Sequence, residues 1–181
     1  MRVLHANNVH RGFGGISRTV ADTVRLLRDH RQTLEFFFLH LQDVTESTVD
    51  RQELLYNASV LAHYAQVSTT ATSDVPTPGN LAQVFDQFVL DSSLADDAEM
   101  MEAAGSQCLL LAGFFEDQMR GRHSIRWFAE LGAGFYHRAA AHAESRRAPL
   151  LSAMGRHFEP WRQRHARLSR ELRDQPYMLP P

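Results

Sequence analysis

Apolar residues recur along most of this chain with the spacing of an amphipathic α-helix. The longest pattern alternates steps of three and four residues through Leu151, Met154, Phe158, Trp161, His165, Leu168 and Leu172. Pro160 lies inside this segment and removes one backbone hydrogen bond. The segment is therefore either one kinked helix or two helices, the second with Pro160 in its first turn.

Shorter helical patterns fill the middle of the chain, and each follows residues that can cap a helix. The first follows Ser47–Asp50 and has the stripe Leu54, Leu55, Ala58, Leu61, Ala62 and Ala65. Three more follow Asn80, the turn Asp91-Ser92-Ser93, and Ser124, and cover residues 81–89, roughly 96–119, and 125–139. The run 108–115 is apolar almost all round, which predicts a central helix. Residues 34–41 fit either a buried strand or a helix.

These patterns predict an all-α fold, a bundle of five to seven helices joined by short connections. Residues 1–33 form a lead-in or first helix, although residues 1–41 could instead form a strand–helix–strand unit. Residues 34–174 form the helical bundle domain, and residues 175–181, with three prolines, an extended tail. A chain of 181 residues can bury such a core without disulfide or metal staples.

The composition indicates a folded protein of a reducing compartment. Apolar residues make up 44% of the chain and charged residues 22%, which argues against disorder. Cys108 is the single cysteine, and its apolar surroundings favour an inert, structural thiol. No apolar run is long enough to span a membrane, and the N-terminus lacks the apolar stretch of a secretory signal. We therefore expect a cytoplasmic protein without a membrane partner.

Charge is unevenly distributed along the chain. Residues 52–117 carry ten acids and no arginine, whereas residues 118–173 carry twelve arginines and four acids; lysine is absent. Either the two halves pair within the fold, or the basic half faces nucleic acid or another anion. The net charge of −2 and the absence of a nucleic-acid motif favour pairing within the fold, so we expect no nucleic-acid partner.

The N-terminal forty residues resemble the opening of a GT-B glycosyltransferase. A short apolar run leads to Gly14 and Gly15, then to the helical pattern that starts at Ile16. The resemblance implies a sugar-nucleotide site at a helix N-terminus, where backbone N–H groups favour anions. The rest of the chain supplies helices instead of the further β-α units that such a fold requires.

Residues 35–145 resemble a family of uncharacterised bacterial all-helical proteins. The matching residues are Gly113-Phe114-Phe115, Arg120-Gly121-Arg122, Ser124, Gly132 and Tyr136-His137-Arg138-Ala139. Glu116 stands where the family often has proline, and Trp127-Phe128 where a tyrosine is common. The resemblance implies a bacterial helical protein and carries no established chemistry.

Ten histidines do not assemble into a metal motif. His137 and His142 lie about 140° apart around a helix, and no Glu-x-x-His, H-E-x-x-H or C-x-x-C occurs. Neither a nucleophile elbow nor a P-loop is present. We therefore predict no catalytic residues, no metal and no cofactor, and we interpret His165, on the apolar seam, as a hydrogen-bonded core histidine.

The densest polar cluster follows the central helix, between two apolar segments. We take it as a candidate anion or partner site, with two residues of the next helix as neighbours: Glu116, Asp117, Arg120, Arg122, His123, Tyr136 and His137. The alternative is a solvated helix connection whose ion pairs contribute about 0–1 kcal/mol each.

The C-terminal helices carry more aromatic residues than one narrow stripe requires, which is typical of a protein–protein interface. The seam 151–172 could pair with a second copy or pack within the chain. The leading hypothesis is a non-enzymatic helical interaction or regulatory module that binds a protein partner or itself. The alternatives are a helical enzyme or a small-ligand or metal-binding protein with a site between helices, and a glycosyltransferase-like nucleotide segment.

Overall fold

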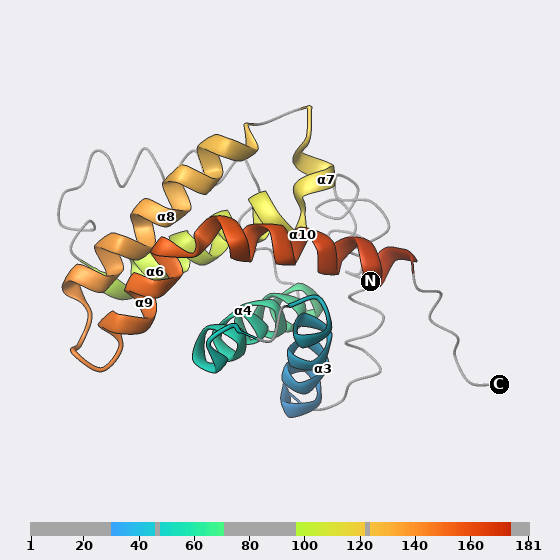
Figure 1. Ribbon diagram of the computed structural model, residues 1–181, viewed down its shortest axis with the longest axis horizontal. Coiled ribbons are helices and arrows are strands. Elements are labelled where there is room, and N and C mark those ends of the chain that lie inside the picture. Colours follow the sequence, from blue (N-terminus) through green and yellow to red (C-terminus); the bar gives the residue numbers. More distant parts are fainter. Residues whose placement is uncertain (1–29, 46–47, 71–96, 122–123, 175–181) are drawn as a thin grey trace, which may run out of the picture.

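The computed structural model describes residues 30–45, 48–70, 97–121 and 124–174 (Figure 1). Within these ranges the chain forms seven α-helices and one π-helical segment, without a strand. The predicted all-α fold is therefore confirmed. The predictions for the helix at 81–89, the glycine loop at Gly14 and Gly15, and the tail 175–181 lie outside the described residues.

Helix α3 (His30–Asp43) settles the ambiguous apolar run at 34–41 as a helix. Its buried side is Thr33, Phe37 and Leu41, continued by Val44 beyond the helix. Leu39 is 52% exposed between the buried Phe37 and Leu41, as a helix requires, whereas a strand would place all three side chains on one face. The helix starts before residue 34, so the predicted domain boundary falls inside α3.

Helix α4 (Arg51–Thr70) is capped by Asp50, whose Oδ1 accepts hydrogen bonds from the backbone N–H groups of Gln52 at 2.6 Å and Glu53 at 3.3 Å. The predicted apolar stripe is buried except for Leu55, which is 48% exposed. Leu54 and Leu55 point about 100° apart, and the core lies on the side of Leu54. The inclusion of Leu55 in the stripe was wrong.

The predicted central helix is a continuous helical stretch with a change of geometry inside it. Helix α6 (Ala98–Leu109) is followed by the π-helical segment η2 (Leu110–Phe114) and the short helix α7 (Glu116–Met119). The Phe115 N–H donates to the Leu110 carbonyl at 2.8 Å, the five-residue step of a π turn. The run 108–115 is buried throughout, which confirms the central position predicted for it.

The C-terminal half contains α8 (Ile125–His142), α9 (Ala148–Arg156) and α10 (Phe158–Asp174). The Ser124 hydroxyl accepts from the Trp127 N–H at 3.2 Å and caps α8, as predicted. His157, with φ −101° and ψ 19°, separates α9 from α10. Pro160 lies in the first turn of α10, where its missing N–H costs nothing, so the two-helix alternative is correct.

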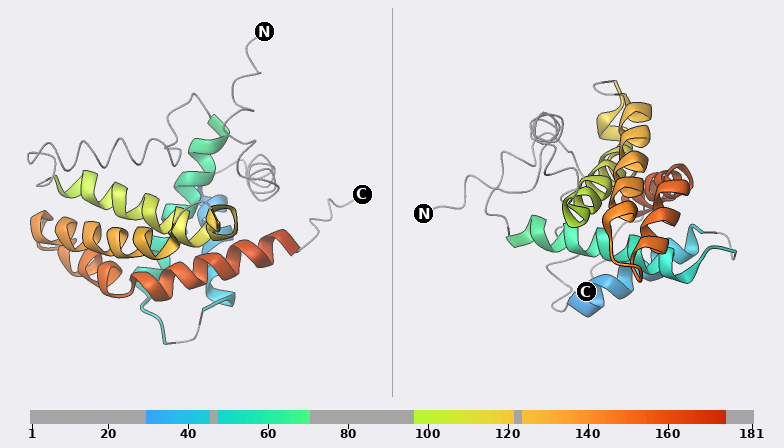
Figure 2. Two further views of the ribbon diagram at one scale, coloured as in Figure 1. Left: turned by 90° about the horizontal axis from the view of Figure 1, so that it is seen from above. Right: turned by 90° about the vertical axis from the view of Figure 1, so that its left-hand side faces the viewer.

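Helix α10 lies in the middle of the fold, with α6, α8 and α9 on one side and the α3–α4 pair on the other (Figures 1 and 2). All seven seam residues from Leu151 to Leu172 are at most 2% exposed. The seam therefore packs within one chain and is not available for pairing with a second copy. Among the helices that the structure describes, none is both long and apolar enough to cross a membrane.

Candidate functional site

The acids of the predicted polar cluster pair with arginines of α10. Glu116 is 7% exposed, and its Oε2 accepts from Arg162 at 2.8 Å. Its Oε1 accepts from Arg120 Nε at 2.9 Å and lies 3.5 Å from Arg170. The carboxylate is thus surrounded by three guanidinium groups, and both of its oxygens are engaged by arginines.

Asp117 extends the same contact toward the end of α10. It accepts hydrogen bonds from Arg173 at 2.7 Å and from Arg170 at 3.3 Å. The bond from Arg173 is the main reason why the pKa of Asp117 is lowered. These pairs join the acidic half of the sequence to the basic half, as the first interpretation of the charge distribution predicts.

The other predicted site residues do not join this cluster. Tyr136 is buried and contacts Tyr56 and Ser106, whereas His137 is exposed and its ring lies against Gly155. Arg122 and His123 lie outside the described residues. The structure therefore brings together Glu116, Asp117 and Arg120 and places Tyr136 and His137 in other surroundings.

Three hydroxyl groups and a carboxylate meet where α4, α6 and α8 pack. The Tyr56 hydroxyl donates to Glu102 at 2.9 Å and lies 3.2 Å from Ser106 Oγ, which is 2.9 Å from the Tyr136 hydroxyl. Arg147 donates to the same Glu102 oxygen at 2.7 Å. Burial raises the pKa of both tyrosines, so these phenols stay protonated and serve as hydrogen-bonding groups.

A second polar contact joins α4 to the corner between α9 and α10. Glu53 is 6% exposed and accepts from Trp161 Nε1 at 2.7 Å; His157 Nδ1 lies 2.9 Å from its carboxylate. One turn further along α4, Asn57 Oδ1 lies 2.9 Å from His165 Nε2. Full burial lowers the pKa of His165 to about 3, which keeps the ring neutral. The prediction of a hydrogen-bonded core histidine is confirmed.

Metal-binding and thiol chemistry find no support in the part of the chain that the structure describes. These residues contain no group of three His, Cys, Asp or Glu side chains that could hold a metal ion. Cys108 is buried, and desolvation raises its pKa to about 12, so the thiol is unreactive at neutral pH.

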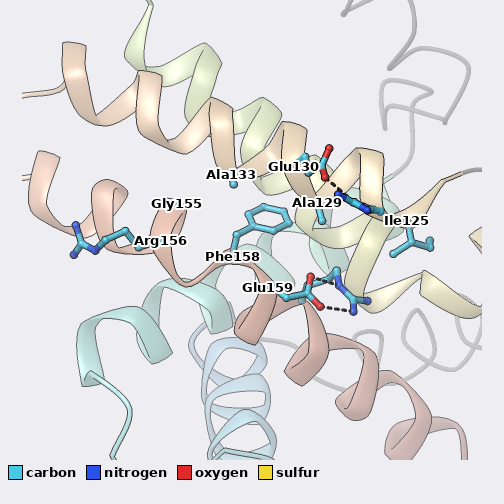
Figure 3. A pocket seen from close by; sticks show the side chains of 10 residues that line it. Ile125, Ala129, Glu130, Ala133, Gly155, Arg156, Phe158 and Glu159 are labelled. Atoms are coloured by element: carbon cyan, nitrogen blue, oxygen red, sulfur yellow. Dashed lines mark hydrogen bonds and ion pairs between the residues drawn. The ribbon is translucent and has the colours of Figure 1, made fainter.

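A groove of about 630 Å³ lies between α8 and the corner where α9 meets α10 (Figure 3). Its floor is small and apolar, formed by Ile125, Ala129, Ala133, Gly155 and Phe158. Figure 3 shows the Phe158 ring directed toward α8, between the two walls. Small side chains at the floor allow the backbone of a bound segment to approach closely.

Charged side chains form the rim of this groove. Arg126 donates to Glu130 at 2.7 Å on α8, and Arg162 makes two bonds to Glu159 at 2.7 and 2.8 Å on α10. Arg156 lies at the opposite end of the groove from these two pairs (Figure 3) and donates to the Ser152 hydroxyl at 2.8 Å. The arrangement is an apolar strip with a polar edge, the anatomy of a protein-binding surface.

Arg162, which lines the groove, connects it to Glu116 of the predicted polar cluster. Besides its bonds to Glu159, Arg162 donates to Glu116 at 2.8 Å and to the Ala112 carbonyl at 3.3 Å. Its side chain is therefore fixed on two sides. Glu116, which the sequence analysis selected, does not line the groove but holds one of its walls in place.

The groove was not predicted, although the sequence of α8 contains a signal for it. Ile125, Ala129 and Ala133 are spaced four residues apart on α8, beside the core stripe of Phe128, Phe135 and Ala139. Two adjacent apolar stripes make a helix face wider than one contact requires. Ile125 was assigned to the core stripe, but it is only partly buried and lines the groove.

The aromatic residues of the C-terminal helices do not form the exposed surface that their number suggests. Five of the six are buried: Phe128, Phe135, Tyr136, Phe158 and Trp161. Trp127 is 47% exposed. These five aromatic side chains therefore build the core.

Comparison of the chain with known protein families, curated proteins and solved structures finds no match. Function is therefore argued from the geometry of the groove and the two polar contacts.

Proposed function

We propose that this chain is a non-enzymatic helical interaction module, and that the groove between α8 and the α9–α10 corner is the surface that receives its partner. The observation that supports this is the floor of Ile125, Ala129, Ala133, Gly155 and Phe158 inside a charged rim. Fully buried apolar centres with polar edges are typical of protein interfaces.

The shape of the groove favours a macromolecular partner over a small ligand. Small-molecule pockets usually enclose most of the ligand surface. Here five of the ten lining residues are charged: Arg126, Glu130, Arg156, Glu159 and Arg162. Arg126 and Glu130 have side chains that are 88% and 64% exposed, so they border the strip without covering it. A bound segment would remain in contact with solvent along one side.

The polar contacts inside the fold argue against a catalytic role for the same residues. Glu116 accepts from Arg162 of α10 and from Arg120 of its own segment, and Glu53 accepts from Trp161 of α10 and lies 2.9 Å from His157 Nδ1. Ser106 has no histidine among its hydrogen-bond partners. These groups are engaged in holding helices together, whereas the floor of the groove has no partner helix over it among the described residues.

The test is to select binders and map them to the groove. A displayed library of helical peptides is panned against the folded chain, and the enriched peptides are measured by fluorescence anisotropy. The groove variant, Ala129→Gln/Ala133→Gln, should weaken them about tenfold, or about 1.4 kcal/mol, because two polar side chains then fill the apolar floor.

The control variant, Gly134→Gln/Ala141→Gln, makes the same number of substitutions on exposed positions of the same helix. It should bind the enriched peptides like the parent protein. Enriched peptides that bind the groove variant and the parent protein with equal affinity would contradict the proposal. Circular dichroism of both variants establishes that they are folded.

A further inference from the structure

Resting on the proposed function, we infer that the occupant of the groove is an acidic amphipathic helix of another protein, with a carboxylate opposite Arg156. The helical form and the acidic character follow from different features of the groove.

The floor of the groove has the periodicity of a helix-binding surface. Ile125, Ala129 and Ala133 form a ridge along α8 that spans about 12 Å, or about two helical turns. A partner helix presents anchors at intervals of three and four residues, which matches such a ridge. The small side chains of Ala129 and Ala133 allow the two helix axes to lie close together.

The charges of the rim specify an acidic partner. The Arg126–Glu130 and Arg162–Glu159 pairs neutralise one end of the groove internally. Arg156, at the other end, has only the Ser152 hydroxyl as a hydrogen-bond partner among the described residues. A carboxylate on the partner therefore finds an unmatched cation, whereas a lysine there meets repulsion.

A matched pair of peptides tests this inference. Both are stapled helices of about fourteen residues with the same leucine–alanine stripe. One carries glutamate and the other lysine on the positions that flank the stripe. Fluorescence anisotropy at low salt should show the glutamate peptide binding about tenfold tighter. Arg156→Glu should remove or reverse this preference.

The control for net charge is Arg138→Glu, at an exposed position that does not line the groove. It should leave most of the preference for the glutamate peptide intact. An equal loss with Arg138→Glu would show general attraction and overturn the assignment of Arg156.

The remaining outcomes separate this inference from the proposed function. If both peptides bind equally and the groove variant weakens both, the groove remains a docking surface but the acidic partner is wrong. If the glutamate peptide binds the groove variant and the parent protein with equal affinity, the docking function itself fails. Binding of neither peptide overturns the helical occupant. A dimer seen by light scattering that the groove variant dissociates also overturns it, because the occupant is then a second copy.

Discussion

The buried polar contact around Glu53 and the open groove beside Phe158 lie on opposite sides of the same α9–α10 corner and are built on different principles. Glu53 contacts the Trp161 indole and the half-exposed His157 ring, and Asn57 contacts the His165 ring, so polar side chains of separate segments bond to one another. The groove instead presents small apolar residues to solvent and keeps its charges at the edge. The comparison teaches that polar residue type alone does not distinguish a buried contact between helices from an open surface.

The largest effect should come from removing the central side chain of the buried contact. Trp161 is fully buried and donates to Glu53. Trp161→Ala should lower the free energy of unfolding by about 3–5 kcal/mol, because it leaves a large cavity and a carboxylate without its donor. Urea denaturation measures the loss. Trp127→Ala, on the exposed tryptophan, should cost clearly less, and equal losses would contradict the contrast between interior and surface.

The second effect is a pH dependence that His165 imposes. The folded protein keeps this ring neutral down to about pH 3, whereas the unfolded chain takes up a proton below about pH 6.5. The unfolded state then binds more protons, so stability falls as the pH falls through this window. Between about pH 6.5 and pH 5 the parent protein should lose about 2 kcal/mol more than His165→Gln. Urea denaturation at both pH values checks this, and identical losses would show that His165 is protonated in the fold.

The third effect concerns the hydroxyl cluster. Tyr136→Phe removes a buried hydroxyl that lies 2.9 Å from Ser106, and should cost about 1–2 kcal/mol. Tyr64→Phe is the matched control, because burial raises the pKa of Tyr64 to about 12 and its hydroxyl has no hydrogen-bond partner among the described residues. That variant should change stability by about 0.5 kcal/mol or less. Thermal unfolding of the two variants measures the difference. Equal stability losses would show that the Tyr136 hydroxyl has no special structural role.

The smallest effect is the opposite change in stability expected when two glycines of α8 are replaced by alanine. A Cβ at Gly134 would meet nothing within 4 Å, so Gly134→Ala should raise the free energy of unfolding by about 0.5–1 kcal/mol. A Cβ at Gly132 would lie 2.4 Å from the Phe158 ring and 2.7 Å from Cys108 Cβ, so Gly132→Ala should instead destabilise. Thermal melts that move in the same direction for both variants would contradict the close packing of α8 against Phe158.

The helices were predictable from sequence because their signals are local. Ser124, Pro160 and the seam 151–172 act within a few residues of where they stand, and each is found where its chemistry predicts. The partners of Glu116 and Glu53 could not be predicted, because each binds residues far along the chain that only the packing of α10 brings near. The π turn at 110–114 was missed because an apolar run gives no sign of a change in helical pitch.

The groove was hidden for another reason. Partly buried apolar residues such as Ile125 and Ala133 look in sequence like members of the core. They differ from core residues only in that no helix among the described residues covers them. Periodicity therefore locates an apolar face but does not say whether the protein itself or a partner fills it.

The most direct test of the account is chemical-shift mapping of the isotopically labelled protein titrated with the tightest peptide selected from the library. The account predicts that the largest amide shifts gather along one side of the α9–α10 corner, at Ile125, Ala129, Ala133, Gly155 and Phe158. Shifts centred on Glu53, Tyr56 and Tyr136, with the groove unchanged, would contradict it.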